Sequence, residues 1–485
     1  MRIKILEKYR NIPVQVRASF WFLICSFMQR GISVITTPIF TRILSASEYG
    51  DYNAFNSWLG IVTIFTSLRL YYGVFDQGLV KFETERNVFA SSMQGLLFTL
   101  VTGWTCVYLC FHNFFNRLFS LSTVQMLAMF AMIWATGAFN FWAGEQRVIY
   151  SYRRLVLVTI LASIAKPVVS IIFILLSEDK VTARILGLMC VELIGYFWCF
   201  IVHMIRGKVF FSAKYWKYAL LFNIPLVPHY LSQTVLNSAD RIMIRDMIGS
   251  AQAGIYSLAY SVSQIMTLFN QALIHTLTPW IYQKIKADKP EEIPGIAYIA
   301  FGLIGAVNLI LIILAPEIVR LFAPAAYYEA IWVIPPVAMS GLFIFAYNMF
   351  AAFEFYFEKS NFIMVASVAG AVLNIVLNFI FIRIFGYYAA GYTTLVCYII
   401  YALGHYYNMV SICKENFKGR KIYDKKLLLT IATVFLVSGF LFLFLYNLPF
   451  VRYGVVIILL IILSIKREKI METINLILSI RRKKR

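Results

Sequence analysis

The chain has few acidic residues, no hydrophilic stretch longer than a loop, and no motif that binds nucleotides. Asp and Glu together number 23 against 44 Lys and Arg, and only 14% of the 485 residues are charged. A glycine-rich phosphate-binding loop is absent, so ATP is not the direct energy source for any work that the protein performs. These absences exclude a soluble globular domain and an ATP-driven machine.

The cysteines provide no metal site and no disulfide framework. All seven lie within or beside apolar runs, at irregular spacing, whereas zinc sites and disulfide-rich domains have regularly spaced pairs. We interpret them as small lipophilic packing residues.

What the chain does have is a succession of apolar runs. Hydrophobic residues make up 61% of the sequence, against roughly 45–50% in soluble domains. Each run is about 20 residues long, which is the length of a helix that crosses the hydrocarbon core of a bilayer. The pattern predicts an all-α polytopic membrane protein of about 14 transmembrane helices. The predicted spans are 16–42, 52–71, 88–111, 122–142, 155–176, 184–204, 218–244, 253–275, 295–315, 330–353, 362–384, 388–411, 427–446 and 451–465.

The distribution of positive charge indicates the orientation. If the N-terminus is cytoplasmic, 32 of the 44 basic residues fall in cytoplasmic segments and eight in outer loops. This bias predicts that both termini are cytoplasmic. It also accounts for the net charge of +21 without a nucleic-acid surface. The basic tail from Lys466 onward has the apolar spacing of an interfacial helix.

An internal repeat divides the chain. The segments LSASEYGDY (44–52) and IGSAQAGIY (248–256) align with matching Gly and Tyr positions, and six predicted spans separate them. Two six-helix lobes with the same orientation are a transporter architecture that binds substrate between the lobes. We therefore expect an N-lobe at 1–212, a C-lobe at 213–413, and two further helices with the basic tail at 414–485.

Four segments carry a family resemblance. PIFTRILSASEYGDYNAF (38–55), QGLVKF (77–82), DRIMIRDMIGSAQAGIYSLAYSV (240–262) and FGYYAAGYTT (385–394) resemble the corresponding parts of polysaccharide-export flippases of the MOP superfamily, the Wzx-type O-antigen or capsule-unit flippases. The resemblance implies a V-shaped pair of lobes, followed by two extra helices.

The same resemblance implies a function. Such proteins move an undecaprenyl-pyrophosphate-linked oligosaccharide, destined for lipopolysaccharide O-antigen or capsule, from the inner to the outer leaflet by alternating access. It further implies residence in the bacterial inner membrane and partnership with a polysaccharide polymerase and a chain-length regulator. We expect no cofactor, no metal and no catalytic residues, with H⁺ or Na⁺ as the coupling ion.

Ionisable residues inside predicted spans are candidates for the substrate and ion sites, because charge within a bilayer is costly. Arg30 lies near the middle of span 1, where its planar guanidinium could hold pyrophosphate. Lys166 and Glu192 lie at similar depth in one helical hairpin, and an ion pair between them is the economical interpretation. The alternative leaves Lys166 in the cavity and Glu192 free to carry a proton.

The remaining candidates come from span 7 and from the helix breakers. Arg241 is a third candidate cation, and Asp240 and His229 join Glu192 as candidates for ion coupling. Arg69 lies near the cytoplasmic face, where a snorkelling side chain is favoured, and His405, near a span end, has no assigned role. Prolines interrupt helical hydrogen bonding and mark predicted hinges. They are Pro38, Pro225 and Pro228.

Two other functions remain as alternatives. A membrane-embedded polysaccharide polymerase or glycosyltransferase would also be basic and polytopic, but the outer loops here are mostly about ten residues or fewer, too short for a catalytic loop. Glu48 and Asp51 in the first outer loop suit a turn better than catalysis. An ion-coupled multidrug antiporter is the second alternative, disfavoured by the two extra spans.

Overall fold

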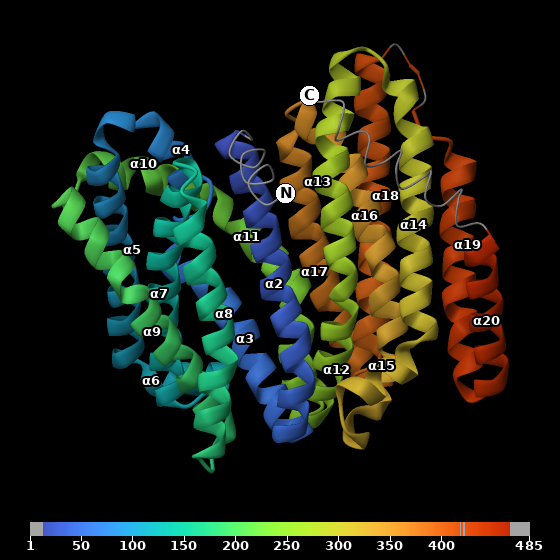
Figure 1. The fold of residues 1–485 in the computed structure, drawn as a ribbon, viewed down its shortest axis with the longest axis horizontal. Coiled ribbons are helices and arrows are strands. Elements are labelled where there is room, and N and C mark those ends of the chain that lie inside the picture. Colours follow the sequence, from blue (N-terminus) through green and yellow to red (C-terminus); the bar gives the residue numbers. More distant parts are fainter. Residues whose placement is uncertain (1–12, 418, 421, 466–485) are drawn as a thin grey trace, which may run out of the picture. The chain divides into compact units, whose positions relative to one another are not determined.

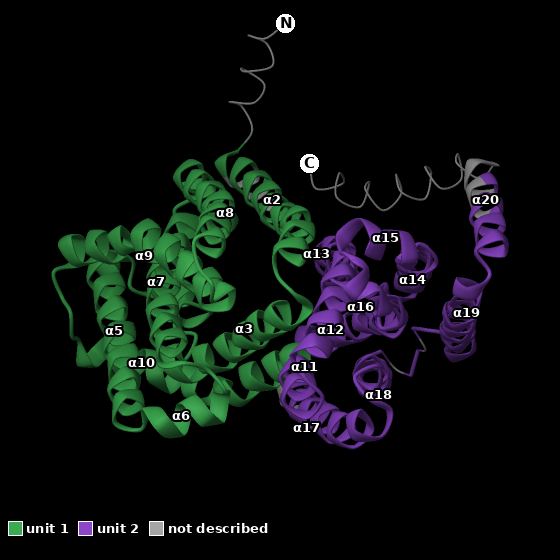
Figure 2. Cartoon of the chain, turned by 90° about the horizontal axis from the view of Figure 1, so that it is seen from below, with its two compact units in different colours: residues 1–238 green, residues 239–485 purple. Residues whose placement is uncertain are grey.

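The computed structural model describes residues 13–465 apart from 418 and 421. Every regular element in this part of the chain is a helix. The chain forms two compact units, residues 1–238 and 239–485, coloured separately in Figure 2. The boundary falls inside helix α11, so it does not coincide with the predicted lobe boundary at 212/213. The predicted lobes, defined by helix count and repeat, stay a prediction.

The first unit is built from long helices joined by short turns (Figure 1). Its elements are α2 (Val14–Ile43), α3 (Ala46–Ser67), α4 (Val74–Lys81), η1 (Glu83–Glu85), α5 (Arg86–Cys110), α6 (His112–Phe119), α7 (Thr123–Val148), α8 (Tyr152–Leu175), α9 (Lys180–Gly207), α10 (Ala213–Asn223), η2 (Ile224–Leu226) and the first half of α11 (Val227–Met247).

The second unit has the same construction, after the second half of α11. Its elements are α12 (Ser250–Ser263), α13 (Ile265–Lys286), η3 (Pro290–Glu292), α14 (Ile293–Ile313), α15 (Ala315–Phe322), η4 (Ala325–Trp332), α16 (Ile334–Tyr356), α17 (Ser360–Phe385), α18 (Ala389–Asn416), α19 (Lys425–Phe444), η5 (Leu445–Asn447) and α20 (Pro449–Ile465). The predicted interfacial helix after Lys466 lies outside the described residues.

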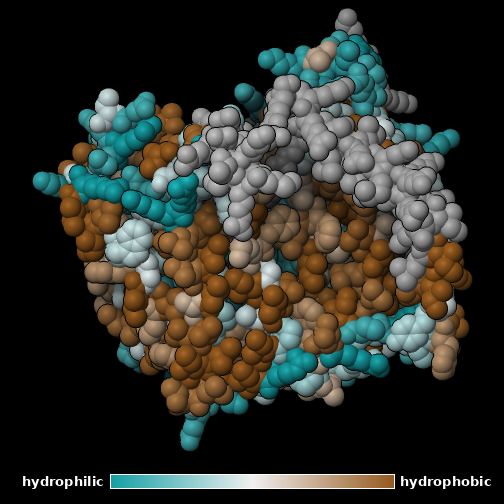
Figure 3. All heavy atoms as spheres, in the orientation of Figure 1, coloured by the Kyte–Doolittle hydropathy of each residue, from teal (hydrophilic) through white to brown (hydrophobic). Residues whose placement is uncertain are grey.

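Ten of the described helices are long and apolar enough to cross a membrane. In both units, hydrophobic side chains cover the middle of the visible face and hydrophilic ones gather at the helix ends (Figure 3). Large apolar side chains such as Leu161 and Ile194 are exposed on helices of this kind, which suits contact with lipid rather than water. The protein is therefore a multi-pass membrane protein, although the count of fourteen spans is not confirmed.

Three predicted spans differ from the helices observed. Span 2 (52–71) ends early, at Ser67, and residues 68–73 are not α-helical. Span 7 (218–244) is divided into α10, η2 and α11, because Pro225 and Pro228 remove backbone donors that a continuous α-helix needs. Span 8 (253–275) is divided into α12 and α13 next to Gln264.

The two most buried spanning helices lie at the centres of the units. In the most apolar 18-residue stretch of α7, 72% of the residues are buried, and in that of α16 the share is 83%. By contrast, only 17% of the residues in the corresponding stretch of α19 are buried. Helices that are apolar all round and buried must be surrounded by other helices, whereas α19 presents most of its surface outward.

Two of the segments that carried the family resemblance make clear structural contacts. Ser45 and Glu48 form a capping box at the start of α3, in which Ser45 Oγ accepts from the Glu48 amide and the Ser45 amide donates to the Glu48 carboxylate at 2.7 Å. Within QGLVKF, Gly78 packs so tightly on the Phe89 ring that a Cβ would lie 2.1 Å from it. Glu48 therefore lies in the first turn of α3 as a capping residue, rather than in the loop turn that the sequence suggested.

The glycine-rich turn FGYYAAGYTT connects α17 to α18. Gly386 has a φ of +74°, which glycine adopts without the steric penalty of a side chain. Tyr387 and Tyr388 then both donate hydrogen bonds to the Glu329 carboxylate on η4, at 2.5 Å and 2.9 Å. Burial, followed by this hydrogen bond, raises the pKa of Tyr387. The turn is thereby fixed to a neighbouring loop.

Helices α8 and α9 approach each other closely at Gly187. A Cβ there would lie 2.7 Å from Ser170 Cα, which is backbone that cannot move aside cheaply. We expect Gly187→Ala to lower the free energy of unfolding by about 1–3 kcal/mol through overpacking. Thermal unfolding of the purified protein measures this. Gly195→Ala, on the same helix with no heavy atom within 4 Å of the new Cβ, is the matched control and should be silent.

Candidate functional site

The first candidate site begins where α3 ends. Leu68 and Arg69 both have a φ of +48°, a left-handed conformation that two successive side-chain-bearing residues rarely adopt. Asn223 Nδ2 donates to the Leu68 carbonyl at 2.7 Å and holds the bend. Such strained conformations persist only where surrounding contacts maintain them, and they concentrate at functional sites.

The bend directs Arg69 toward the beginning of α11. Its guanidinium donates to Thr234 Oγ1 at 3.4 Å and lies 5.4 Å from the ring centroid of Tyr230. The Tyr72 ring meets Tyr230 edge-on, with centroids 6.1 Å apart, and 62% of Tyr72 is exposed. We call Arg69, Tyr72, Tyr230 and Thr234 the arginine–tyrosine cluster.

This cluster can bind two kinds of group. A guanidinium presents several donors in a plane that matches phosphate oxygens. Aromatic rings with one exposed face offer apolar surface together with a hydroxyl. The sequence favoured a snorkelling role for Arg69, which stays a prediction; the structure adds that the chain leaves the helix before Arg69 and turns it onto Tyr230. His229 belongs to the same segment, with its half-buried ring 6.0 Å from that of Tyr230.

The predicted hinge residues occupy different settings. Pro38 lies inside α2, which continues to Ile43. Pro225 is within the 3₁₀ turn η2, and Pro228 is in the first turn of α11, where a missing backbone N–H costs little. Movement at any of the three stays a prediction.

Lys166 and Glu192 form the ion pair that their equal depth predicts. Lys166 Nζ lies 2.7 Å from Glu192 Oε1, and the Thr136 hydroxyl donates to the other carboxylate oxygen at 2.9 Å. The Lys166 ammonium also lies 5.5 Å from the centroid of the Tyr196 ring. The carboxylate is thus held by α7 and α8 together, although any further role for either residue in substrate binding or ion coupling stays a prediction.

Reversing the charges tests whether this pair is structural. Lys166→Glu alone should lower the free energy of unfolding by roughly 1–3 kcal/mol, since one member is buried and the other is 29% exposed. Adding Glu192→Lys should restore most of that loss. Thermal unfolding of the four proteins gives the comparison. If the single variant is as stable as the double variant, the pair does not hold these helices together.

Asp240 and Arg241 point in different directions, as adjacent helical residues must. Asp240 is buried and accepts a short hydrogen bond from the Tyr256 hydroxyl on α12. The Arg241 guanidinium instead stacks 4.0 Å from the ring centroid of Tyr260. Both residues therefore fasten α11 to α12 in the second unit. Arg30 lies midway along α2 and is half-buried.

Two buried carboxylate–histidine pairs were missed by the sequence interpretation. Glu145 on α7 lies 3.2 Å from His203 Nε2 on α9, with Gln94 on α5 at 3.0 Å from the other ring nitrogen. In the second unit, both carboxylate oxygens of Glu354 lie within 2.9 Å of His405 Nδ1. The signal available was a carboxylate and a histidine in different apolar runs, which gives no pairing by itself.

Known families and proteins resemble this chain in sequence. A family model described as polysaccharide biosynthesis protein matches residues 16–285, and one described as MatE matches residues 225–380. The Lsg locus protein 1 of Haemophilus influenzae is 24% identical over 212 residues, which are 41% of this chain and 51% of that protein. The chain thus spans about half the length of this curated relative.

Solved structures share the fold. The lipid II flippase MurJ in an inward closed conformation gives a TM-score of 0.64 at 14% identity, covering 88% of this chain and 99% of that one. An inward-facing multidrug resistance MATE family transporter of the MOP superfamily gives 0.62 at 13% identity, covering 79% and 96%. A MOP superfamily transporter from Pyrococcus furiosus gives 0.51 at 13% identity, covering 82% and 94%. The fold is that of MOP superfamily transporters. Since the first family model covers more than half of the chain, the protein belongs to the polysaccharide biosynthesis protein family.

Proposed function

We propose that the protein is a flippase that carries an undecaprenyl-pyrophosphate-linked oligosaccharide, an O-antigen or capsule repeat unit, from the cytoplasmic to the outer leaflet. The observation that carries the proposal is the arginine–tyrosine cluster, in a chain whose family makes polysaccharides. The guanidinium of Arg69 would hold the diphosphate, and the partly exposed face of Tyr72 would lie against a sugar ring.

Other parts of the chain would serve the lipid tail, further substrate contacts and ion coupling. The polyprenyl chain stays in lipid, because the exposed surface of the spanning helices is apolar. Arg30 and Arg241 are further cations for the substrate, and alternating access would expose them in turn to each leaflet. Asp240, Glu192 and His229 are the candidates for H⁺ or Na⁺ coupling. The working location is the bacterial inner membrane with both termini cytoplasmic, beside a polymerase and a chain-length regulator.

Complementation tests the proposal. The gene is expressed in bacteria that lack their own O-unit or capsule flippase, using hosts with several different repeat units, and surface polysaccharide is measured. We expect at least one host to recover its polysaccharide. Recovery should be lost with Arg30→Ala, which removes a predicted cavity cation, at equal membrane abundance. Normal export by Arg30→Ala would remove Arg30 from the substrate site, and failure in every host would contradict the flippase function.

The MatE match over residues 225–380 favours a second candidate, an ion-coupled antiporter of the multidrug type. The same strains separate the two functions. A multidrug exporter would raise resistance to cationic dyes without restoring polysaccharide, whereas a glycan flippase would do the reverse. An enzyme is not favoured, because the similar solved structures are of transporters and a flippase.

A further inference from the structure

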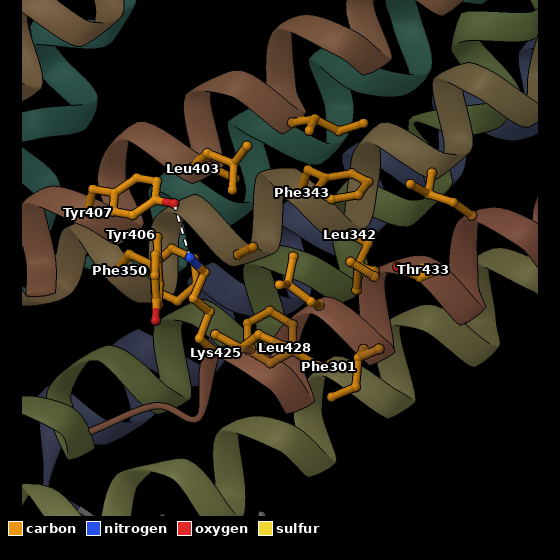
Figure 4. A pocket seen from close by; sticks show the side chains of 17 residues that line it. Phe301, Leu342, Phe343, Phe350, Leu403, Tyr406, Tyr407, Lys425, Leu428 and Thr433 are labelled. Atoms are coloured by element: carbon orange, nitrogen blue, oxygen red, sulfur yellow. Dashed lines mark hydrogen bonds between the residues drawn. The ribbon is translucent and has the colours of Figure 1, made fainter. Parts of the chain in front are cut away.

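A pocket opens in the second unit, and none of the residues that line it is among those discussed as a substrate site. It has a volume of about 260 Å³ and lies among α14, α16, α18 and α19. Its walls are almost entirely apolar and include Phe301, Leu342, Phe343 and Leu428 (Figure 4). The pocket belongs wholly to one compact unit, so its shape does not depend on the other.

One end of the pocket is polar. Lys425, at the beginning of α19, places its ammonium 3.5 Å from the Tyr407 hydroxyl and 5.6 Å from the centroid of the Tyr407 ring (Figure 4). The Tyr406 ring, 5.6 Å from that of Tyr407, lines the same end. The opposite end, near Thr433 and Leu436, has no charged residue among those that line it.

Lys425 differs from Arg420, a basic residue of the same segment, in its charged partners. Arg420 is held by two carboxylates, those of Asp288 at 3.2 Å and Glu291 at 3.6 Å. Asp424, beside Lys425 in sequence, uses its carboxylate to cap α19 through the amides of Lys426 and Leu427. Within the described part of the chain, no carboxylate lies at ion-pair distance from Lys425. Its charge is available to an anion that enters the pocket.

The length of the pocket matches one leaflet. Along α19 its lining runs from Lys425 to Leu436, which at 1.5 Å per residue is about 16 Å of helix. Half of the hydrocarbon core of a bilayer is about 15 Å. With Lys425 and the tyrosines at the headgroup level, the pocket would extend to near the middle of the membrane.

We propose that this pocket is a binding site for an anionic phospholipid of the leaflet in which α19 begins. One acyl chain lies along the apolar wall, and the headgroup phosphate accepts hydrogen bonds from the Lys425 ammonium and the Tyr407 hydroxyl. The distribution of basic residues makes this the cytoplasmic leaflet, which is rich in anionic lipid. The occupant is argued from charge complementarity and from length, and it does not depend on what the protein transports.

Native mass spectrometry of the purified full chain tests the proposal, with phosphatidylglycerol and phosphatidylcholine added separately. We expect phosphatidylglycerol to bind wild type more tightly than phosphatidylcholine. Lys425→Ala should weaken phosphatidylglycerol about five-fold, the effect of one basic residue at a lipid headgroup. Lys426→Ala is the matched control. It removes the same charge from the next residue in the chain, whose side chain does not line the pocket.

A second variant tests the apolar wall. Ala432→Phe fills the middle of the pocket and should weaken phosphatidylglycerol while leaving Lys425 in place. Equal binding of both lipids, or equal loss with Lys425→Ala and Lys426→Ala, would overturn the proposal. Displacement of phosphatidylglycerol by an equal concentration of polyprenyl phosphate would also overturn it, since the pocket would then belong to a polyprenyl chain. If Ala432→Phe lowers the thermal unfolding temperature without lipid, the Lys425 comparison decides alone.

Discussion

Arg69→Gly is expected to reduce polysaccharide export roughly 10- to 100-fold while leaving the protein folded. The loss corresponds to one hydrogen-bonded charged contact with the diphosphate, worth about 1.5–3 kcal/mol. Glycine is the informative replacement because Arg69 has a φ of +48°, a conformation that glycine adopts more easily than alanine. Removing the side chain relieves backbone strain but also removes its contacts with Thr234 and Tyr230, so we expect the loss of export at an unchanged thermal unfolding temperature of the purified variant. The measurement is surface polysaccharide in a complemented flippase-deficient host.

Two further variants locate the cause of the loss. Arg69→Lys keeps the charge but not the planar fork, so it should recover only part of the activity. Arg117→Ala, an exposed arginine on α6 of the same unit, is the matched control and should export normally. Export by Arg69→Gly at the wild-type rate and equal abundance would show that the arginine–tyrosine cluster does not bind the substrate.

The helices themselves were predictable because membrane insertion leaves a strong record in sequence. Runs such as 88–111 and 295–315 correspond to α5 and α14 within a few residues, since an apolar run must end where polar groups return to water. The break after Ser67 was not predictable in this way. Leu68 carries no signal for a left-handed conformation, and the contact that holds it comes from Asn223, 155 residues away.

The candidate sites likewise divide into those that could be predicted from nearby sequence and those that depend on distant contacts. Lys166 and Glu192 could be paired from sequence because one short hairpin places them at equal depth, and their partnership depends on little else. Arg69 could not be assigned, because its depth was readable but its partners on α11 were not. Glu354 was placed just outside span 10 (330–353), whereas α16 continues to Tyr356 and keeps the carboxylate among buried side chains. The helix end thus concealed the burial of Glu354, and its pairing with His405, 51 residues away, had no signal in the sequence.

Removing either member of the Glu354 and His405 pair is expected to destabilise the second unit strongly. Both residues are 0% exposed, and His405 Nδ1 lies 2.8 Å and 2.9 Å from the two carboxylate oxygens. The Tyr401 ring packs edge-on against the imidazole with centroids 4.5 Å apart. Removing one partner leaves the other polar group buried without compensation. We therefore expect Glu354→Ala or His405→Ala to lower the free energy of unfolding by about 3–5 kcal/mol, measured by thermal unfolding of the purified protein.

A double variant shows whether the loss of stability comes from the polar group left without its partner or from the loss of side-chain volume. Replacing both residues with leucine removes both buried polar groups at once, so the double variant should be more stable than either alanine variant. The exposed pair of Lys359 and Glu415, 3.7 Å apart and more than half exposed, is the matched control, because its removal should cost less than about 1 kcal/mol. If the single alanine variants cost no more than this control, then water or rearranged side chains must satisfy the remaining partner, and the pair would contribute little to holding α16 against α18.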